Sequence, residues 1–303
     1  MNALNQRPKP IINTLVVIGL GLIGGSLAAS VKAAGICRQV VAVVRRREVA
    51  DIALQKSIID RFCLSIEEIA DELSLGDVIF ISVPAMSIKE VLLSIKDNVP
   101  ESVTVTDGTS VKGSVISAIN EVYNSVPSQF VPGHPIAGSE KHGVNAASNE
   151  LYKNHRVILT PLPVTGAAHR ERVKTMWQAV GAEVLTMSVE DHDEVLAATS
   201  HLPHAIAYSL VDTLSRDVNN ENIFRYAAGG FRDFTRIASS DPTMWHDIML
   251  TNREAIVSCI ELFQRNLDKM RHAIANNDSD YLLKAFTRAK MARDLFSKEM
   301  AKK

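Results

Sequence analysis

Residues 15–26 have the sequence LVVIGLGLIGGS, and this stretch decides the fold of the chain. Its first four residues are apolar and mostly β-branched, which is typical of a parallel strand covered on both faces. Three glycines follow in the pattern G-x-G-x-x-G, at Gly19, Gly21 and Gly24. The first permits a tight turn, the second lets a pyrophosphate approach the backbone, and the third lets helix and strand pack closely. A simple tight turn is the alternative, but a place after a strand and before a helix favours a dinucleotide site.

The helix predicted after these glycines completes an anion site. It runs from Leu22 to about Ala34, and Gly35 ends it. The unpaired N–H groups of its first turn and the positive end of its dipole stabilise a phosphate at the glycine loop. The residues expected to hold the dinucleotide here are Gly19, Gly21, Leu22, Ile23 and Gly24.

The composition is that of a globular chain with small-molecule partners. Its 303 residues exceed a usual single domain, so two domains are expected. A net charge of -1 provides no bulk attraction to nucleic acid or to an anionic membrane. No apolar run reaches the roughly 18 to 20 residues of a spanning helix, and the first residues lack the apolar core of a signal peptide, so we expect a cytoplasmic protein. Cys37, Cys63 and Cys259 are far apart and form no C-x-x-C pair, which favours reduced packing residues and no metal site.

Three arginines follow the second predicted strand, Val40–Val44, and they bear on the choice of cofactor. NAD-binding folds usually place an acidic residue about 20 residues past the glycines, where it accepts a hydrogen bond from the ribose 2′-hydroxyl, whereas an arginine there accommodates a 2′-phosphate. Arg45, Arg46 and Arg47 occupy this slot, and no acid does. The cofactor is therefore NADP or NAD, with Arg45 and Arg46 favouring NADP. A solvated loop is the alternative explanation for the arginines.

Two later strands are predicted to end beside the cofactor. In open α/β sheets ligands bind at the carboxyl ends of the strands. The strand over 77–83 ends at Val83 and Pro84, and the strand over 103–106 ends at residues 107–112, which include Thr109. Further strands are predicted at 129–131, 156–159 and 183–186, and helices at 51–58, 66–73, 87–96, 114–123 and 167–180.

From Val189 onward the pattern is helical, with helices predicted at 191–214, 223–228, 231–238, 241–274 and 279–300. We predict a Rossmann-type, doubly wound and mostly parallel sheet in residues 1–188, followed by an all-helical domain in residues 189–303. Apolar residues on more than one face of the last two helices favour packing against a second copy of the chain, so a homodimer is expected through this domain. The interior of a large monomer would give the same pattern. These apolar residues include Ile256, Ile260, Phe263, Leu267, Leu282, Leu283 and Phe286.

His134 is the candidate catalytic base. It follows a predicted strand, in a turn bounded by glycine and proline, at the edge of the sheet where a nicotinamide would lie. Oxidation of an alcohol needs a base for the hydroxyl proton, and histidine titrates nearest neutral pH. A histidine that caps its own loop is the alternative.

The helical part contains two further polar groups. Residues 200–204 have the sequence SHLPH, in which Ser200 and His204 share a helical face and Pro203 kinks the helix. Two histidines on a helix suggest metal ligands, but no H-E-x-x-H pattern or nearby carboxylate supports this, and core histidines are commoner. Arg236 lies among apolar residues of the sequence FRDFTRI, where a guanidinium binds a carboxylate strongly, so it is the candidate for a substrate carboxylate.

Five motifs in this order resemble the prephenate and arogenate dehydrogenase family, over nearly the whole chain. The motifs are GLGLIGGSLA at 19–28, DGTSVK at 107–112, GHPIAGSE at 133–140, SHLPH at 200–204, and FRDFTRIA at 231–238 with Asp241, Pro242 and Trp245. The resemblance implies oxidative decarboxylation on the route to tyrosine, with a nicotinamide cofactor accepting hydride. The three arginines resemble the NADP-using members more than the NAD-using ones.

The resemblance also implies residue roles. His134 matches the histidine that takes the ring-hydroxyl proton, and Ser110 matches a serine that orients it. Arg236 matches the arginine that binds the substrate carboxylate. Residues of the substrate pocket and its surrounding shell are matched by Ser200, His204, Glu140, Asp233 and Trp245.

Two other functions are compatible with the pattern. Dehydrogenases of β-hydroxy acids also have a helical second domain, but they use a lysine there as the acid–base group, and the candidate here is His134. A dinucleotide-sensing protein without catalysis would be expected to lack part of the polar set, yet Ser110, His134, His204 and Arg236 are all present. The sequence leaves the choice between prephenate and arogenate open.

Overall fold

The computed structural model describes residues 10–139, 141–216 and 225–301, with no account of the side chains of 299–301. The chain forms two compact units, one up to Arg253 and one from Glu254 onward. The predicted domain boundary at residue 188 lies within the first unit and stays a prediction.

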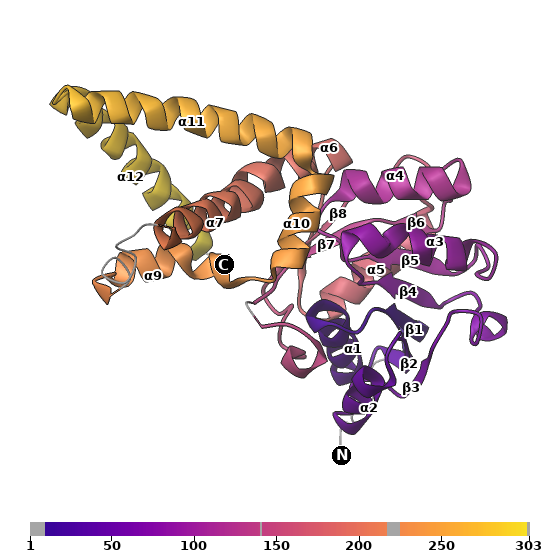
Figure 1. Cartoon of the computed structure of the whole chain (residues 1–303). Coiled ribbons are helices and arrows are strands. Elements are labelled where there is room, and N and C mark those ends of the chain that lie inside the picture. Colours follow the sequence, from indigo (N-terminus) through magenta and orange to yellow (C-terminus); the bar gives the residue numbers. More distant parts are fainter. Residues whose placement is uncertain (1–9, 140, 217–224, 302–303) are drawn as a thin grey trace, which may run out of the picture. The chain divides into compact units, whose positions relative to one another are not determined.

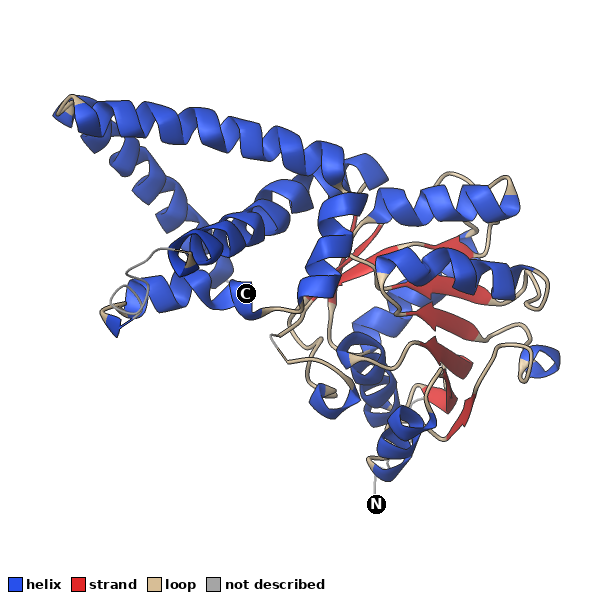
Figure 2. Ribbon diagram, viewed as in Figure 1, coloured by secondary structure: helices blue, strands red, loops and turns tan. Residues whose placement is uncertain are grey.

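The first unit is built on a parallel sheet of six strands in the order β3-β2-β1-β4-β5-β6 (Figures 1 and 2). Every strand pair in it is parallel, and the chain reverses its direction of growth across the sheet between β1 and β4. This order is the doubly wound arrangement, in which ligands bind at that switch point. The strands are β1 (Ile12–Ile18), β2 (Cys37–Val43), β3 (Arg61–Cys63), β4 (Val78–Ile81), β5 (Thr104–Asp107) and β6 (Phe130–Val131).

Helices cover both faces of this sheet because its strands are apolar on both sides. Leu15 and Val17 of β1 pack toward α1 (Leu22–Ala34), α2 (Arg47–Gln55) and α5 (Ala167–Ala179). Val16 and Ile18 pack toward α3 (Ile88–Lys96) and α4 (Lys112–Tyr123). The predicted Rossmann-type fold is confirmed.

A second, smaller sheet extends the first unit in the order β7-β8-β9. Its strands are β7 (Gly133–Ile136), β8 (Arg156–Leu159) and β9 (Glu183–Thr186), and β7 runs antiparallel to β8. His134, expected in an open turn, is therefore held in a strand opposite Ile158.

Helices complete the first unit. They are α6 (Val189–Leu196), α7 (Leu202–Ser215), α9 (Gly229–Thr235) and α10 (Pro242–Thr251), with a π-helical stretch at Ala197–His201 and a 3₁₀ turn at Arg236–Ser239. The helix predicted over 191–214 is helical throughout, but a π-helical stretch just before Pro203, where a kink was expected, divides it into α6 and α7. The helix predicted over 66–73 is wrong, since only a 3₁₀ turn forms at Ala70–Glu72. The helix predicted over 223–228 lies partly outside the described residues.

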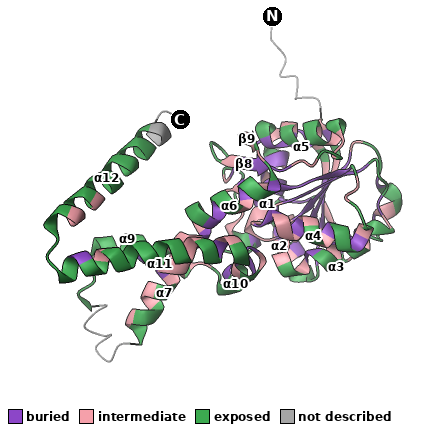
Figure 3. Ribbon diagram, turned by 90° about the horizontal axis from the view of Figure 1, so that it is seen from above, coloured by how far each residue is buried: buried purple, intermediate pink, exposed green. Residues whose placement is uncertain are grey.

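The second unit consists of α11 (Arg253–Ala275), which begins at the last residue of the first unit, and α12 (Ser279–Ala301). Asn252 interrupts the single helix predicted over 241–274. In Figure 3 the strands of the first unit are buried, whereas the residues of α11 and α12 are mostly exposed. Among the described residues, no helix combines the length and apolar character needed to cross a membrane.

Candidate active site

The three glycines after β1 each occupy a place that suits the role predicted for them. Gly19 has a φ of +92°, which favours glycine. A Cβ atom on Gly24 would lie 2.2 Å from the carbonyl oxygen of Gly19, so only glycine lets α1 pack this closely. A Cβ atom on Gly21 would meet nothing within 4 Å. Gly21 therefore faces open space, at the N-terminus of a helix that no side chain caps among the residues the structure describes.

A cleft of about 600 Å³ lies at the carboxyl ends of the central strands. It brings together ten of the residues predicted for the site: Gly21, Leu22, Ile23, Val83, Pro84, Thr109, Ser110, His134, Ser200 and Trp245. The Oγ1 atom of Thr109 is buried here without a hydrogen-bond partner among the described residues. An open glycine, an uncapped helix N-terminus and an unpaired hydroxyl fit a dinucleotide, which makes many hydrogen bonds to such groups.

Arg45 and Arg46 do not line this cleft. Both side chains are exposed after β2, and within the described part of the chain neither forms a hydrogen bond or an ion pair. Arg46 precedes α2, and Arg47 lies with its guanidinium 5.9 Å from the centre of the Phe62 ring. Gly19 and Gly24 do not line the cleft either, because they form the packed base of the loop.

His134 lines the cleft and is tied to the protein through its other side. Its Nδ1 atom lies 2.9 Å from Nε2 of His192, and the two rings meet edge to face. Burial lowers the pKa of His134 well below its usual range, and the neighbouring His192, Lys112 and His201 lower it further. His134 is therefore neutral at pH 7 and able to accept a proton.

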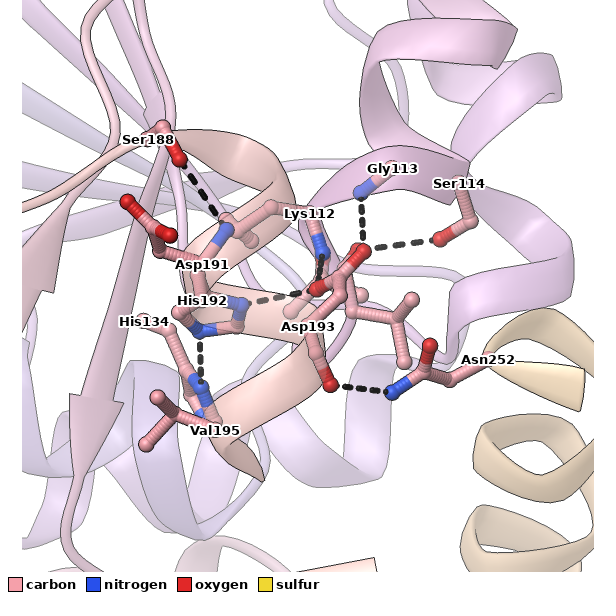
Figure 4. Close-up of polar contacts among 12 residues, drawn as sticks. Lys112, Gly113, Ser114, His134, Ser188, Asp191, His192, Asp193, Val195 and Asn252 are labelled. Carbon is pink, nitrogen blue, oxygen red and sulfur yellow. Dashed lines mark hydrogen bonds and ion pairs between the residues drawn. The ribbon is translucent and has the colours of Figure 1, made fainter. Parts of the chain in front are cut away.

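His192 is in turn bonded to Asp193, as Figure 4 shows. Nδ1 of His192 lies 2.7 Å from Oδ1 of Asp193. The carboxylate also accepts hydrogen bonds from the backbone N–H groups of Lys112 and Gly113, at 2.9 and 2.7 Å. Burial alone would raise the pKa of Asp193, but these hydrogen bonds lower it below its usual value, so the group is ionised.

Lys112 is fully buried beneath the site and joins three parts of it. Its ammonium group forms an ion pair with Asp107 at the end of β5 and donates to the carbonyl oxygen of Gly133 in β7. Asp107 also accepts hydrogen bonds from the backbone N–H groups of Thr109 and Gly133. These contacts fix the strand that carries His134 against the end of the parallel sheet.

The helical side of the cleft has two layers. Ser200 and Trp245 lie on its surface, and His204 lies behind Trp245 with the two rings stacked 3.6 Å apart between centroids. Burial lowers the pKa of His204, the carbonyl of Ser200 opposes this shift, and the charge of Arg236 adds to it. Arg236 thus lies close to His204 but does not line the cleft itself.

Other predicted site residues lie elsewhere. Asp233 is exposed and forms an ion pair with Arg232. Glu140 lies outside the described residues. Ser110 lines the cleft with His134, but His134 bonds to His192 and not to Ser110 in the described part of the chain.

His192 and Asp193 were not predicted as site residues. In the sequence they stand within an ordinary polar helix start, and the only signal is the charged run Asp191-His192-Asp193 in the first turn of the helix after the last strand. Their position behind His134 follows from the antiparallel strand β7, which the sequence pattern did not reveal.

Comparison with known proteins identifies the family. The family model described as "Prephenate dehydrogenase, nucleotide-binding domain" matches residues 27–186, and "Prephenate dehydrogenase, dimerization domain" matches residues 188–288. The chain belongs to the prephenate dehydrogenase family.

Individual relatives agree with this assignment. Cyclohexadienyl dehydrogenase of Zymomonas mobilis is 38% identical over 288 residues, which are 93% of this chain and 96% of the relative. Prephenate dehydrogenase of Bacillus subtilis is 35% identical over 93% of this chain and 76% of its own length. The crystal structure of prephenate dehydrogenase from Aquifex aeolicus in complex with hydroxyphenyl propionate and NAD⁺ is 36% identical, covers 93% of this chain and 97% of its own, and has a TM-score of 0.86.

These matches confirm several predictions. The chain is a dehydrogenase that uses a nicotinamide cofactor and a small-molecule substrate, and its family acts in tyrosine biosynthesis. The residue roles stay predictions, as do the choice between NAD and NADP and the homodimer.

Proposed function

We propose that this chain oxidatively decarboxylates prephenate, arogenate or both, with His134 as the base at the ring hydroxyl. The observation that carries the proposal is the position of His134, which lines one cleft together with Gly21 on the cofactor side and with Ser200 and Trp245 on the helical side. A cofactor on the glycine loop and a substrate against the helices would both reach His134.

The chemistry needs few groups from the protein. Both substrates are cyclohexadienes with a carboxylate on one ring carbon and a hydroxyl on the opposite carbon. A bound nicotinamide supplies the acceptor for the hydride that leaves the hydroxyl-bearing carbon. His134 takes the hydroxyl proton, the ring carboxylate leaves as carbon dioxide, and the ring becomes aromatic. His134 then returns the proton to the phenolate oxygen, so the reaction releases no net proton.

The remaining predicted residues bind and orient the substrate in this proposal. Arg236, beside His204, binds a substrate carboxylate through its guanidinium. Ser200, Trp245 and His204 form the wall behind the ring. Ser110, which lines the same cleft, orients His134. Glu140 and Asp233 belong to the polar shell that the family resemblance implies.

The test of the base is the substitution His134→Asn. Because a general base contributes about 10²- to 10⁴-fold, turnover of prephenate should fall by that factor while the Kd of the cofactor stays within about two-fold. Steady-state rates of nicotinamide reduction and fluorescence titration measure the two quantities. His155→Asn, which changes an exposed histidine that does not line the cleft, is the control and should retain turnover. Full turnover in His134→Asn would remove His134 as the base.

We further propose that the cofactor is NADP, on the basis of Arg45 and Arg46. Both guanidinium groups are exposed after β2 and free to meet a 2′-phosphate, which a charge-assisted contact binds strongly. Replacing both by alanine should raise the KM for NADP by at least about 10-fold, or roughly 1.4 kcal/mol, and leave the KM for NAD unchanged. Arg38→Ala, on the exposed part of β2, is the control.

The assay combines prephenate or arogenate with NAD or NADP and so tests both choices at once. Two results would contradict the NADP proposal. One is a wild-type enzyme that prefers NAD, and the other is a double variant in which the KM for NADP and the KM for NAD rise by the same factor.

We also propose that the chain forms a homodimer through its helical domain. The match of residues 188–288 to a dimerization domain supports this, as do the exposed apolar residues of α11 and α12.

A further inference from the structure

Two residues, His192 and Asp193, lie in a row of hydrogen-bonded side chains behind His134. His192 and Asp193 lie side by side on α6, the first helix after the small sheet. His192 is fully buried, with an exposed fraction of 0%, and its ring connects His134 to the carboxylate of Asp193. A buried histidine between a candidate base and a carboxylate calls for a physical reason, because burial of such groups is costly unless each hydrogen bond is made.

Asp193 fixes the direction of each hydrogen bond in the row of side chains His134, His192 and Asp193. An ionised carboxylate only accepts, and Asp193 already accepts from the N–H groups of Lys112 and Gly113. Nδ1 of His192 must therefore donate to Asp193. A neutral imidazole has one donor and one acceptor, so with His192 in this form its Nε2 accepts and Nδ1 of His134 carries the hydrogen. This leaves Nε2 of His134 with a lone pair and, among the described residues, with no hydrogen-bond partner.

Asp193 is held in place from two other elements. The N–H groups that it accepts from are the first two of α4, a helix whose own N-cap residue makes no side-chain hydrogen bond. Asp193 thus caps a helix other than its own, and the positive end of that helix stabilises its charge. The side-chain amide of Asn252 donates to the backbone carbonyl of Asp193 at 2.9 Å. The carboxylate has no freedom to turn away from His192.

We propose that His192 and Asp193 are positioning residues that hold His134 in the tautomer whose Nε2 atom faces the substrate. This inference rests on the proposed function of His134 as the base, and it assigns to α6 a part in the reaction. In water, imidazole prefers the opposite tautomer with hydrogen on Nε2, so the protein must impose the reactive one. The arrangement is the same in kind as the orienting carboxylate behind the histidine of a serine protease, with one additional ring in between.

The same three side chains can hold the proton that is removed from the substrate during turnover. When Nε2 of His134 takes the hydroxyl proton, the new positive charge forms in a buried site beside Lys112 and His201. Nδ1–H of His134 can then shift its proton to Nε2 of His192, whose own Nδ1–H stays bonded to Asp193. The charge moves toward the carboxylate, which stabilises it, and the reverse shift returns the proton to the phenolate oxygen. Asp107 neutralises Lys112 and does not contact either ring.

Three variants separate the parts of this proposal. In His192→Leu the acceptor for His134 is lost, and we expect kcat to fall by about 10²-fold or more, with KM changed by less than about three-fold. In His192→Gln the side-chain oxygen still accepts from Nδ1 of His134 but cannot take a proton, so kcat should fall by a smaller factor of about 10. Asp193→Asn removes the charge and also weakens the cap of α4, so its loss of kcat is compared with its loss of thermal stability.

Surface variants provide the controls. Asp191→Asn changes an exposed carboxylate on the same helix, and His155→Gln changes an exposed histidine before β8. Both should keep wild-type kcat. A kcat within two-fold of wild type in His192→Leu would overturn the proposal.

A direct readout of the tautomer does not depend on activity. In protein labelled with ¹⁵N-histidine, two-bond ¹H–¹⁵N correlation spectra distinguish protonated from unprotonated ring nitrogens, and the His134→Asn variant identifies the His134 signals. We expect hydrogen on Nδ1 of His134 in the wild type and a shift to Nε2 in His192→Leu. Hydrogen on Nε2 in the wild type would overturn the proposal even if turnover of prephenate is normal. A wild-type protein with hydrogen on Nδ1 but no turnover of prephenate or arogenate would instead overturn the proposed function.

Discussion

Gly21 and Gly24 share one motif but differ in what surrounds them. A Cβ atom on Gly24 would meet the Gly19 carbonyl at 2.2 Å and the Val17 side chain at 2.9 Å, whereas one on Gly21 would meet nothing within 4 Å. The backbone of Gly21 is extended, with φ of -89° and ψ of -158°, and accepts a side chain without strain. The packing glycine and the binding glycine can therefore be told apart by experiment.

We expect Gly21→Val to unfold within about 0.5 kcal/mol of wild type but to bind the cofactor at least about 10-fold more weakly, because its methyl groups enter the space left for the phosphates. Gly24→Ala should lose about 1–3 kcal/mol of stability through overpacking. Chemical denaturation and fluorescence titration with the reduced cofactor measure the two effects. Equal losses of stability in both variants would contradict the division of roles.

The role of a residue could be predicted where neighbouring residues in the sequence indicate it. The glycine spacing is local, so the dinucleotide loop was predictable from residues 19–24 alone. His134 was predictable as a site residue from its place after a strand and its family motif. His192 was not, because a histidine that points into the protein from a helix start has the same local pattern as an exposed one. Only the pairing of β7 with β8 brings its partner into reach.

At the element scale, the π-helical stretch Ala197–His201 turns His201 into the interior. The Nδ1 atom of His201 lies 3.1 Å from the side-chain amide of Asn252, which also donates to Asp193. Nδ1 must therefore accept, and a proton there would face a donor. Burial lowers the pKa of His201 to about 4. The charge of Asp193 raises this pKa, and the neighbouring His192 and His204 lower it further.

This predicts a loss of stability in mild acid. The folded-state pKa lies below the unfolded value, so the contribution of His201 is fully present above pH 6.5 and is lost as the pH falls toward 4. A difference of that size corresponds to about 3 kcal/mol. His201→Asn keeps an acceptor without titrating, and its free energy of unfolding should vary less between these pH values than that of wild type. His155→Asn, at an exposed site, should keep the wild-type slope; a wild-type slope in His201→Asn would contradict the prediction.

The broken helix also shows why element boundaries escape sequence analysis. Residues 191–214 keep helical periodicity, and only Pro203 indicates a break. Proline lacks an N–H group, so the backbone before it can change its hydrogen bonding, and here it does so as a π-helical stretch. The extra residue in that turn shifts the face on which Ser200 and His201 lie relative to His204. Equal spacing in the sequence therefore did not place Ser200 and His204 side by side in the cleft.

At the scale of the whole molecule, the parallel sheet was predictable because its strands are continuous apolar runs separated by helices. The short strands β3 and β7 were not predicted, since each has only three or four residues and contains polar or cyclic side chains. The helical content of the residues after 188 was predictable from the sequence, but the positions at which the helices are interrupted were not. Apolar side chains that remain exposed in one copy of the chain indicate an assembly with a second copy.

An apolar stripe on α11 favours assembly of two copies of the chain. Within α11, apolar residues recur every three or four positions, a stripe typical of helices that pack against another helix. They are Ile256, Ile260, Phe263, Leu267, Met270 and Ile274. Leu267 and Ile274 are more than half exposed in the chain, as are Leu283 and Phe286 of α12. Burying such side chains gains about 1.5–3 kcal/mol each, so a second copy of the chain would stabilise them.

We expect light scattering at micromolar concentration to give twice the mass of one chain. Leu267→Asp and Phe286→Asp place charges in the proposed interface and should shift the protein toward monomer, with a lower and concentration-dependent unfolding temperature. Arg288→Asp, which changes a polar position of α12, is the control. Because the proposed site lies within the first unit, the monomeric variants should still bind the cofactor. A wild-type protein of single-chain mass under these conditions would contradict the dimer, and these helices would then need another partner for their apolar faces.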